Sequence, residues 1–84
     1  MSQFLKVTVH DRTGVLFTGD AEAVSSRNEK GSFDILSGHE HFISLILNKV
    51  EIHLPGEKKS YDVTRGMLSV VNDEVTVLLG VLPN

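Results

Sequence analysis

Residues 31–42 read Gly31-Ser32-Phe33-Asp34-Ile35-Leu36-Ser37-Gly38-His39-Glu40-His41-Phe42, and they are the most informative part of the sequence. Phe33 and Ile35 alternate with polar residues, which is typical of a strand with one buried face. A Gly-His turn ends that strand, and a second apolar run continues to Leu47. The turn also holds two histidines around one glutamate, so this segment could be a metal site, a pH switch or a docking turn.

The same period-two alternation recurs along the whole chain and predicts short strands separated by turns. The segments expected to be strands are 4–10, 15–17, 21–25, 32–35, 42–47, 49–54, 61–63, 68–70 and 75–79. About eight to ten short strands at this spacing predict a single-domain, all-β fold: an antiparallel β-sandwich or flattened barrel. The segment 40–48 has a rough helical spacing as well, but a strand buried on both faces is preferred.

Turn residues separate these strands. Pro55-Gly56 fits a type II turn, and Asn72-Asp73 fits the tip of a hairpin. The polar segment 26–31 is expected to be an exposed loop, and Arg65-Gly66 is expected to break the chain between two strands.

Length and composition narrow the function. The chain has 84 residues, enough for one small domain, and its formal net charge of −3 argues against nucleic acid as a partner. With no cysteine, disulfides and thiolate chemistry are excluded for this sequence. The beginning of the chain lacks the apolar core of a signal peptide, and no apolar run is long enough to span a membrane. We therefore expect a soluble protein that meets a membrane only through a partner.

A metal site is the sharpest chemical alternative. His39 and His41 would face the same way on a strand and could share a metal. The cupin family uses such a pair with a glutamate three or four residues later, but Ser44 and Leu45 stand at those positions. Hydrogen-bonded turn and surface histidines are the favoured interpretation. The candidate third ligands are His10, Asp34, Glu40 and His53.

No other pattern predicts an active site. No serine lies in a G-x-S-x-G elbow, and the glycines are too scattered to make a phosphate-binding loop. The sequence thus predicts no enzyme, no cofactor and no small-molecule substrate. It indicates a binding or structural module.

The order of motifs is more specific. Residues 15–24 (VLFTGDAEAV), 31–39 (GSFDILSGH), 63–70 (VTRGMLSV) and 72–78 (NDEVTVL) resemble successive motifs of one family. The family is the N-terminal β-sandwich domain of the epsilon subunit of F-type ATP synthase, called delta in mitochondria. The resemblance covers essentially all of residues 1–84. Departures from the family pattern are Asp34 for glycine, Ser37 for proline, Glu40-His41 for Ala-Pro and Arg65 for glycine.

The resemblance implies a non-catalytic subunit of the central stalk that couples the gamma subunit to the membrane c-ring during proton-driven ATP synthesis. It implies a peripheral location on the cytoplasmic side of a bacterial membrane, or the equivalent matrix or stromal side. Relatives usually continue into a two-helix domain, which this sequence, ending at Asn84, is expected to lack. The implied contacts with the c-ring or gamma are Glu29, Lys30, Gly31, Ser32, Gly38, His39, Glu40 and His41. A small metal-binding protein using His39 and His41, and a stand-alone adaptor, remain as alternatives.

Overall fold

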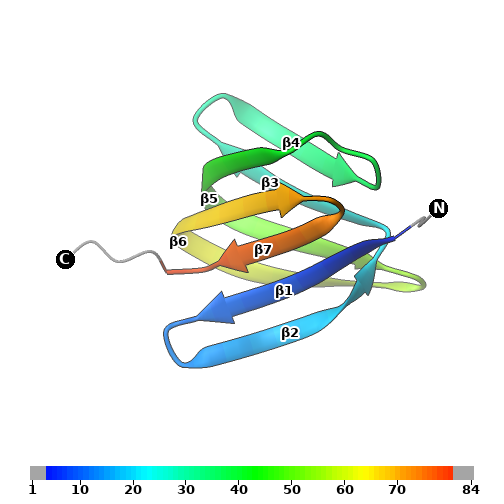
Figure 1. Ribbon diagram of the computed structural model, residues 1–84. Helices are drawn as coiled ribbons and strands as arrows, with labels where there is room; N and C mark the ends of the chain where they lie inside the picture. Colours follow the sequence, from blue (N-terminus) through cyan, green and yellow to red (C-terminus); the bar gives the residue numbers. More distant parts are fainter. Residues whose placement is uncertain (1–3, 81–84) are drawn as a thin grey trace.

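The computed structural model describes residues 4–80, which form seven strands and no helix (Figure 1). The predicted all-β fold is therefore confirmed. The described part also holds no helix of the length and hydropathy needed to cross a membrane. The strands are β1 (Leu5–Asp11), β2 (Gly14–Ala21), β3 (Ala23–Asn28), β4 (Gly31–Leu36), β5 (Phe42–Leu54), β6 (Glu57–Val71) and β7 (Glu74–Leu78).

The strands form one continuous hydrogen-bonded ladder in the order β2-β1-β7-β6-β5-β3-β4. Every neighbouring pair is antiparallel except β1 and β7, which run parallel, so the expectation of a purely antiparallel fold was wrong at this pair. The β6–β7 hairpin turns at Asn72 and Asp73 with φ of 49° and 62°. Both residues tolerate this left-handed conformation, so the hairpin predicted there is confirmed.

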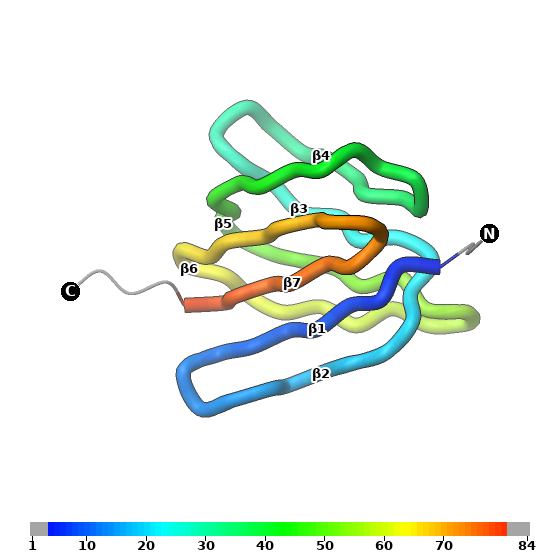
Figure 2. Tube along the Cα trace, in the orientation of Figure 1, coloured from blue at the N-terminus to red at the C-terminus, as the bar shows by residue number. Residues whose placement is uncertain are grey.

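Two long strands bend together and divide the ladder into two layers (Figures 1 and 2). The register of the β5–β6 pair shifts between Ile46 and Asn48, where Asn48 has φ of 69°. Here Leu47 of β5 lies opposite Thr64 and Arg65 of β6, so the bulge is in β6, which passes through Gly66 without ending. The predicted break at Arg65-Gly66 was therefore wrong, and the strand count is seven because segments 42–47 and 49–54 join, as do 61–63 and 68–70.

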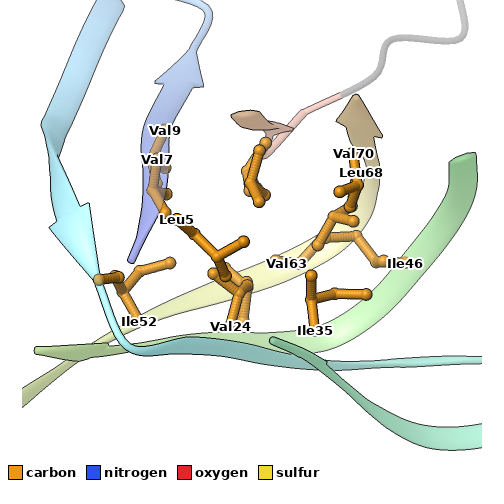
Figure 3. Packing of buried hydrophobic residues seen from close by; sticks show 14 residues of the cluster. Leu5, Val7, Val9, Val24, Ile35, Ile46, Ile52, Val63, Leu68 and Val70 are labelled. Carbon is orange, nitrogen blue, oxygen red and sulfur yellow. The ribbon is translucent and has the colours of Figure 1, made fainter. Parts of the chain in front are cut away.

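The core lies between the two layers. In Figure 3, Val7 and Val9 of β1 lie across the core from Val24 and Ile35 of the other layer. Alternate residues of every strand point inward, as a sandwich requires. The fourteen buried apolar residues are Leu5, Val7, Val9, Ala21, Val24, Ile35, Ile46, Val50, Ile52, Val63, Leu68, Val70, Val75 and Val77.

Gly66 is the glycine at which this packing leaves no room for a side chain. A Cβ there would lie 2.5 Å from the Leu78 carbonyl oxygen and 2.8 Å from Cγ1 of Val63. We predict that Gly66→Ala lowers the free energy of unfolding by about 1–3 kcal/mol, because the two strands must separate. Urea denaturation monitored by circular dichroism measures this.

Gly80→Ala is the matched control, since the nearest atom to its Cβ would be Cγ of Arg12 at 3.9 Å. Equal midpoints for the two variants would show that β6 and β7 do not approach as closely as described.

Candidate functional site

The contact residues implied by the resemblance fall into two groups. The hairpin group is Glu29, Lys30, Gly31 and Ser32, and the turn group is Gly38, His39, Glu40 and His41. They lie near opposite ends of β4, a six-residue strand that spans roughly 17 Å at ~3.3 Å per residue. The structure therefore does not bring the two groups into one site. Each group presents a separate surface.

The segment predicted as an exposed loop is mostly strand. Ser26 belongs to β3, is only 7% exposed, and donates its hydroxyl hydrogen bond to the Lys49 carbonyl at 2.8 Å. Gly31 and Ser32 already belong to β4. The prediction failed because serine, arginine and asparagine are poor strand formers on average, and here cross-strand pairing overrides that preference.

The exposed tip of the hairpin consists of Glu29 and Lys30. Asn28 fixes this tip from both sides. Its Oδ1 accepts a hydrogen bond from the Lys30 amide at 2.9 Å, and its Nδ2 donates to the Ser44 hydroxyl on β5 at 3.0 Å. The two charged side chains therefore project from an anchored turn.

The turn group begins with a tight turn at the end of β4. The His39 amide donates to the Leu36 carbonyl at 3.1 Å, and Gly38 has φ of 87°, as the third residue of a type II turn requires. The carboxylate of Asp73 lies beside this turn. It accepts hydrogen bonds from the Gly38 amide at 2.8 Å and from the Ser37 hydroxyl at 3.1 Å.

Both histidines lie in the segment between β4 and β5, as the favoured interpretation of turn and surface histidines expected, and not on the strand face that the metal alternative required. Nδ1 of His39 donates to the Glu40 carbonyl at 2.8 Å, and Nε2 of His41 lies 3.3 Å from Oδ1 of Asn72. Glu40 and His41 are exposed and His39 is half-buried. A shallow hollow of about 490 Å³ is lined by Gly38, His39, Glu40, His41, Asn72 and Asp73.

A line of aromatic rings joins this turn to the interior. The His39 and Phe42 rings meet edge to face with centroids 5.5 Å apart, and Phe42 meets Phe33 in the same way at 5.3 Å. Such contacts limit the positions open to the His39 ring.

Of the candidate third metal ligands, Glu40 lies between the two histidines and lines the same hollow, whereas His10, Asp34 and His53 do not gather around the pair. Ser25 donates its hydroxyl hydrogen bond to Oδ1 of Asp34 at 2.6 Å, and its oxygen lies 2.9 Å from Nε2 of His53. Asp34 and His53 therefore lie near each other on the outer face of β3, β4 and β5. His10 lies on β1. Within residues 4–80, no three His, Asp or Glu side chains are placed to hold a metal ion.

β5 also carries an exposed apolar ridge that was not predicted from the sequence. Ile43, Leu45 and Leu47 are 67%, 58% and 37% exposed, so the prediction of a strand buried on both faces was wrong. Together with Arg65 and the hairpin tip at 29–30, they line a hollow of about 470 Å³. Period-two alternation in the sequence could have indicated a strand with one exposed face, because Phe42, Ser44 and Ile46 alternate with the three ridge residues.

The ridge continues across the outer face of its layer. Leu45 pairs with Met67, Met67 with Leu78, Leu78 with His10 and His10 with Val15, through β5, β6, β7, β1 and β2. Residues paired across neighbouring strands project from the same face of a sheet. This row is therefore a largely apolar band on the surface, a composition typical of a surface that contacts another protein.

Two carboxyl groups outside both contact groups have perturbed acidities. The Thr13 hydroxyl and amide donate to Asp11 and lower the pKa of its carboxyl group. A hydrogen bond from Lys49, together with the charge of Lys58, lowers the pKa of Glu51 against the opposing effect of desolvation. The hydrogen bonds and ion pairs behind these shifts stabilise the turn after Asp11 and the pairing of β5 with β6. Neither Asp11 nor Glu51 belongs to the hairpin group or the turn group.

Comparison with known proteins adds the family. The family described as "ATP synthase, Delta/Epsilon chain, beta-sandwich domain" matches residues 4–81. An ATP synthase epsilon chain from Nitratiruptor sp. is 33% identical over 82 residues, which cover 94% of this chain and 64% of that protein. An ATP synthase epsilon chain from Clostridium novyi is 29% identical over 80 residues, which cover 93% of this chain and 61% of that protein. The chain thus spans less than two thirds of the length of these relatives.

A solved structure shows the same fold at lower identity. A chain of the Euglena gracilis mitochondrial ATP synthase (OSCP, F1 and c-ring) superposes with a TM-score of 0.86 at 18% identity. The superposition covers 94% of this chain and 52% of that one.

The face assignment of β5 predicts opposite outcomes for two isoleucines three residues apart. Ile46→Ala should lower the free energy of unfolding by about 2–5 kcal/mol, because Ile46 is completely buried. Ile43→Ala should change it by less than about 0.5 kcal/mol, because that side chain is already hydrated. Equilibrium urea unfolding compares them, and a loss at Ile43 as large as that at Ile46 would contradict the exposed ridge.

Proposed function

The chain belongs to the family of the ATP synthase delta/epsilon chain, beta-sandwich domain, and from this membership we propose that it is a non-catalytic central-stalk subunit coupling gamma to the c-ring. The observation that carries the proposal is the family match over residues 4–81, which includes both contact groups. Solved structures of mitochondrial ATP synthase that include the c-ring support it by fold.

The architecture suits a mechanical role. A subunit that transmits torque must resist shear, and close-packed side chains between two layers provide that resistance. Here β5 and β6 run through both layers, so that hydrogen bonds and covalent chain as well as core contacts join them. The domain therefore works as a rigid connector that needs no catalytic group or cofactor.

The separation of the contact groups supports two different partners. We assign the hairpin group, with Glu29 and Lys30 exposed, to the polar loops of the c-ring. The turn group, with Glu40 and His41 exposed, is assigned to gamma. Both surfaces carry charged and polar side chains, as a partly hydrated protein contact does. The complex then holds the chain on the cytoplasmic side of a bacterial membrane, or the matrix or stromal equivalent, without direct insertion.

Association with gamma is the first test. We predict that the purified chain co-elutes with the gamma subunit from the same genome at micromolar concentration on size-exclusion chromatography. Separate elution of the two proteins under these conditions would contradict the proposed function.

Substitutions in the two groups should affect different partners. Lys30→Ala should weaken binding to purified c-ring by up to about fivefold and leave gamma binding unchanged, since an exposed charge contributes ~0–1 kcal/mol. His41→Ala should weaken gamma binding alone. Lys59→Ala, an exposed charge on β6 outside both groups, is the control. Surface plasmon resonance measures each pair, and loss of both partners from either substitution would contradict two separate contacts.

A further inference from the structure

Asp73 joins three parts of the molecule through one residue. Its carboxylate accepts hydrogen bonds from the Gly38 amide and the Ser37 hydroxyl in the β4–β5 turn. Its backbone carbonyl accepts from the Lys6 amide at the start of β1 at 2.8 Å. Asp73 itself belongs to the β6–β7 turn. The turn group follows β4, which is at one edge of the strand order. Asp73 thus ties it to β1 and β7, which lie side by side toward the other edge.

The turn needs such a tie because its own residues constrain it weakly. Ser37 occupies the second position of the type II turn, where proline would fix φ at the required value and serine leaves it free. Gly38 at the third position accepts φ of 87° but also accepts many other conformations. Local sequence therefore permits this turn without selecting it, and the two hydrogen bonds to Asp73 supply the selection.

We propose that Asp73 is the positioning residue of the turn group, holding the segment from Ser37 to His41 in the one conformation that its partner binds. This proposal rests on the proposed function, in which gamma is that partner. The same hairpin turn supplies a second point of attachment, because Oδ1 of Asn72 lies 3.3 Å from Nε2 of His41. Without the Asp73 carboxylate the turn samples other conformations, and the apparent affinity falls in proportion to the fraction of molecules that remain competent.

Asp73→Gly separates positioning from folding. Glycine tolerates the φ of 62° at this position, and the resulting Asn-Gly pair is the preferred tip of a two-residue hairpin. The variant therefore keeps the β6–β7 turn and removes only the carboxylate. We expect its unfolding midpoint to stay at the native value, while hydrogen exchange at the Gly38 amide accelerates about tenfold or more.

The dissociation constant for gamma should rise about tenfold in Asp73→Gly. Adding Ser37→Pro should then restore affinity, because proline selects the turn by a covalent constraint in place of the lost hydrogen bonds. Leu36, which precedes it, is already extended in β4, as a residue before proline must be. Proline at position 37 cannot replace the lost carboxylate chemically. Affinity restored by Ser37→Pro therefore distinguishes positioning by Asp73 from direct contact between Asp73 and gamma.

Each outcome decides something. Unchanged exchange at Gly38 would overturn the proposal at its first step, and accelerated exchange with unchanged affinity would overturn the positioning role while leaving the proposed function intact. Weakened binding that Ser37→Pro does not restore would also overturn it, in favour of direct contact. A native chain that fails to bind gamma would overturn the proposed function, and the positioning role with it.

Discussion

The rest of the structure depends on the paired bend of β5 and β6. At this point Thr64 and Arg65 of β6 lie opposite the single residue Leu47 of β5, and Gly66 lets the backbone of β6 approach the Leu78 carbonyl. A single flat ladder of seven strands would leave one apolar face in water. Bending the two longest strands together turns that face onto itself and buries it, while the pairing of β5 with β6 resumes on both sides of the bulge.

The same bend determines which side chains reach the surface. In β6, Thr64 and Arg65 both lie between Val63 and Gly66, whereas Leu47 alone lies between their partners Asn48 and Ile46 in β5. Because a bulge adds one residue to a strand, side chains beyond it change faces, and Val63 and Gly66 are both buried although three residues apart. β5 has no extra residue, so Ile46 and Val50 stay on its inner face while Leu45, Leu47, Glu51 and His53 share its outer face. That outer face is apolar along the ridge and polar at Glu51 and His53, on the far side of the bend.

Alternation along the sequence was sufficient to locate the strand segments, because period-two patterns depend on nearest neighbours alone, but it did not extend β3 to Asn28 or join 61–63 to 68–70. Long-range geometry was not accessible in that way. A glycine after an arginine is an ordinary break signal, and only the approach of β7 explains why Gly66 continues a strand. Likewise, Ser37 and Asp73 are 36 residues apart, and nothing local to either predicts their hydrogen bond. The contact groups came from resemblance, and the structure added that they stand at separate ends of β4.

The parallel pairing of β1 with β7 has a consequence for biosynthesis. β1 pairs with β7, which lies near the end of the described residues. Most of the sheet must therefore leave the ribosome before the core can be buried. Until then the β1–β2 hairpin and the strands β6-β5-β3-β4 have no β7 to join them, and an isolated hairpin is marginally stable in water. The long-range topology of the chain also slows folding relative to a fold built from local contacts. Newly made chains therefore expose β-rich apolar segments for an extended interval, and early association with a chaperone or an assembly partner would protect them from aggregation.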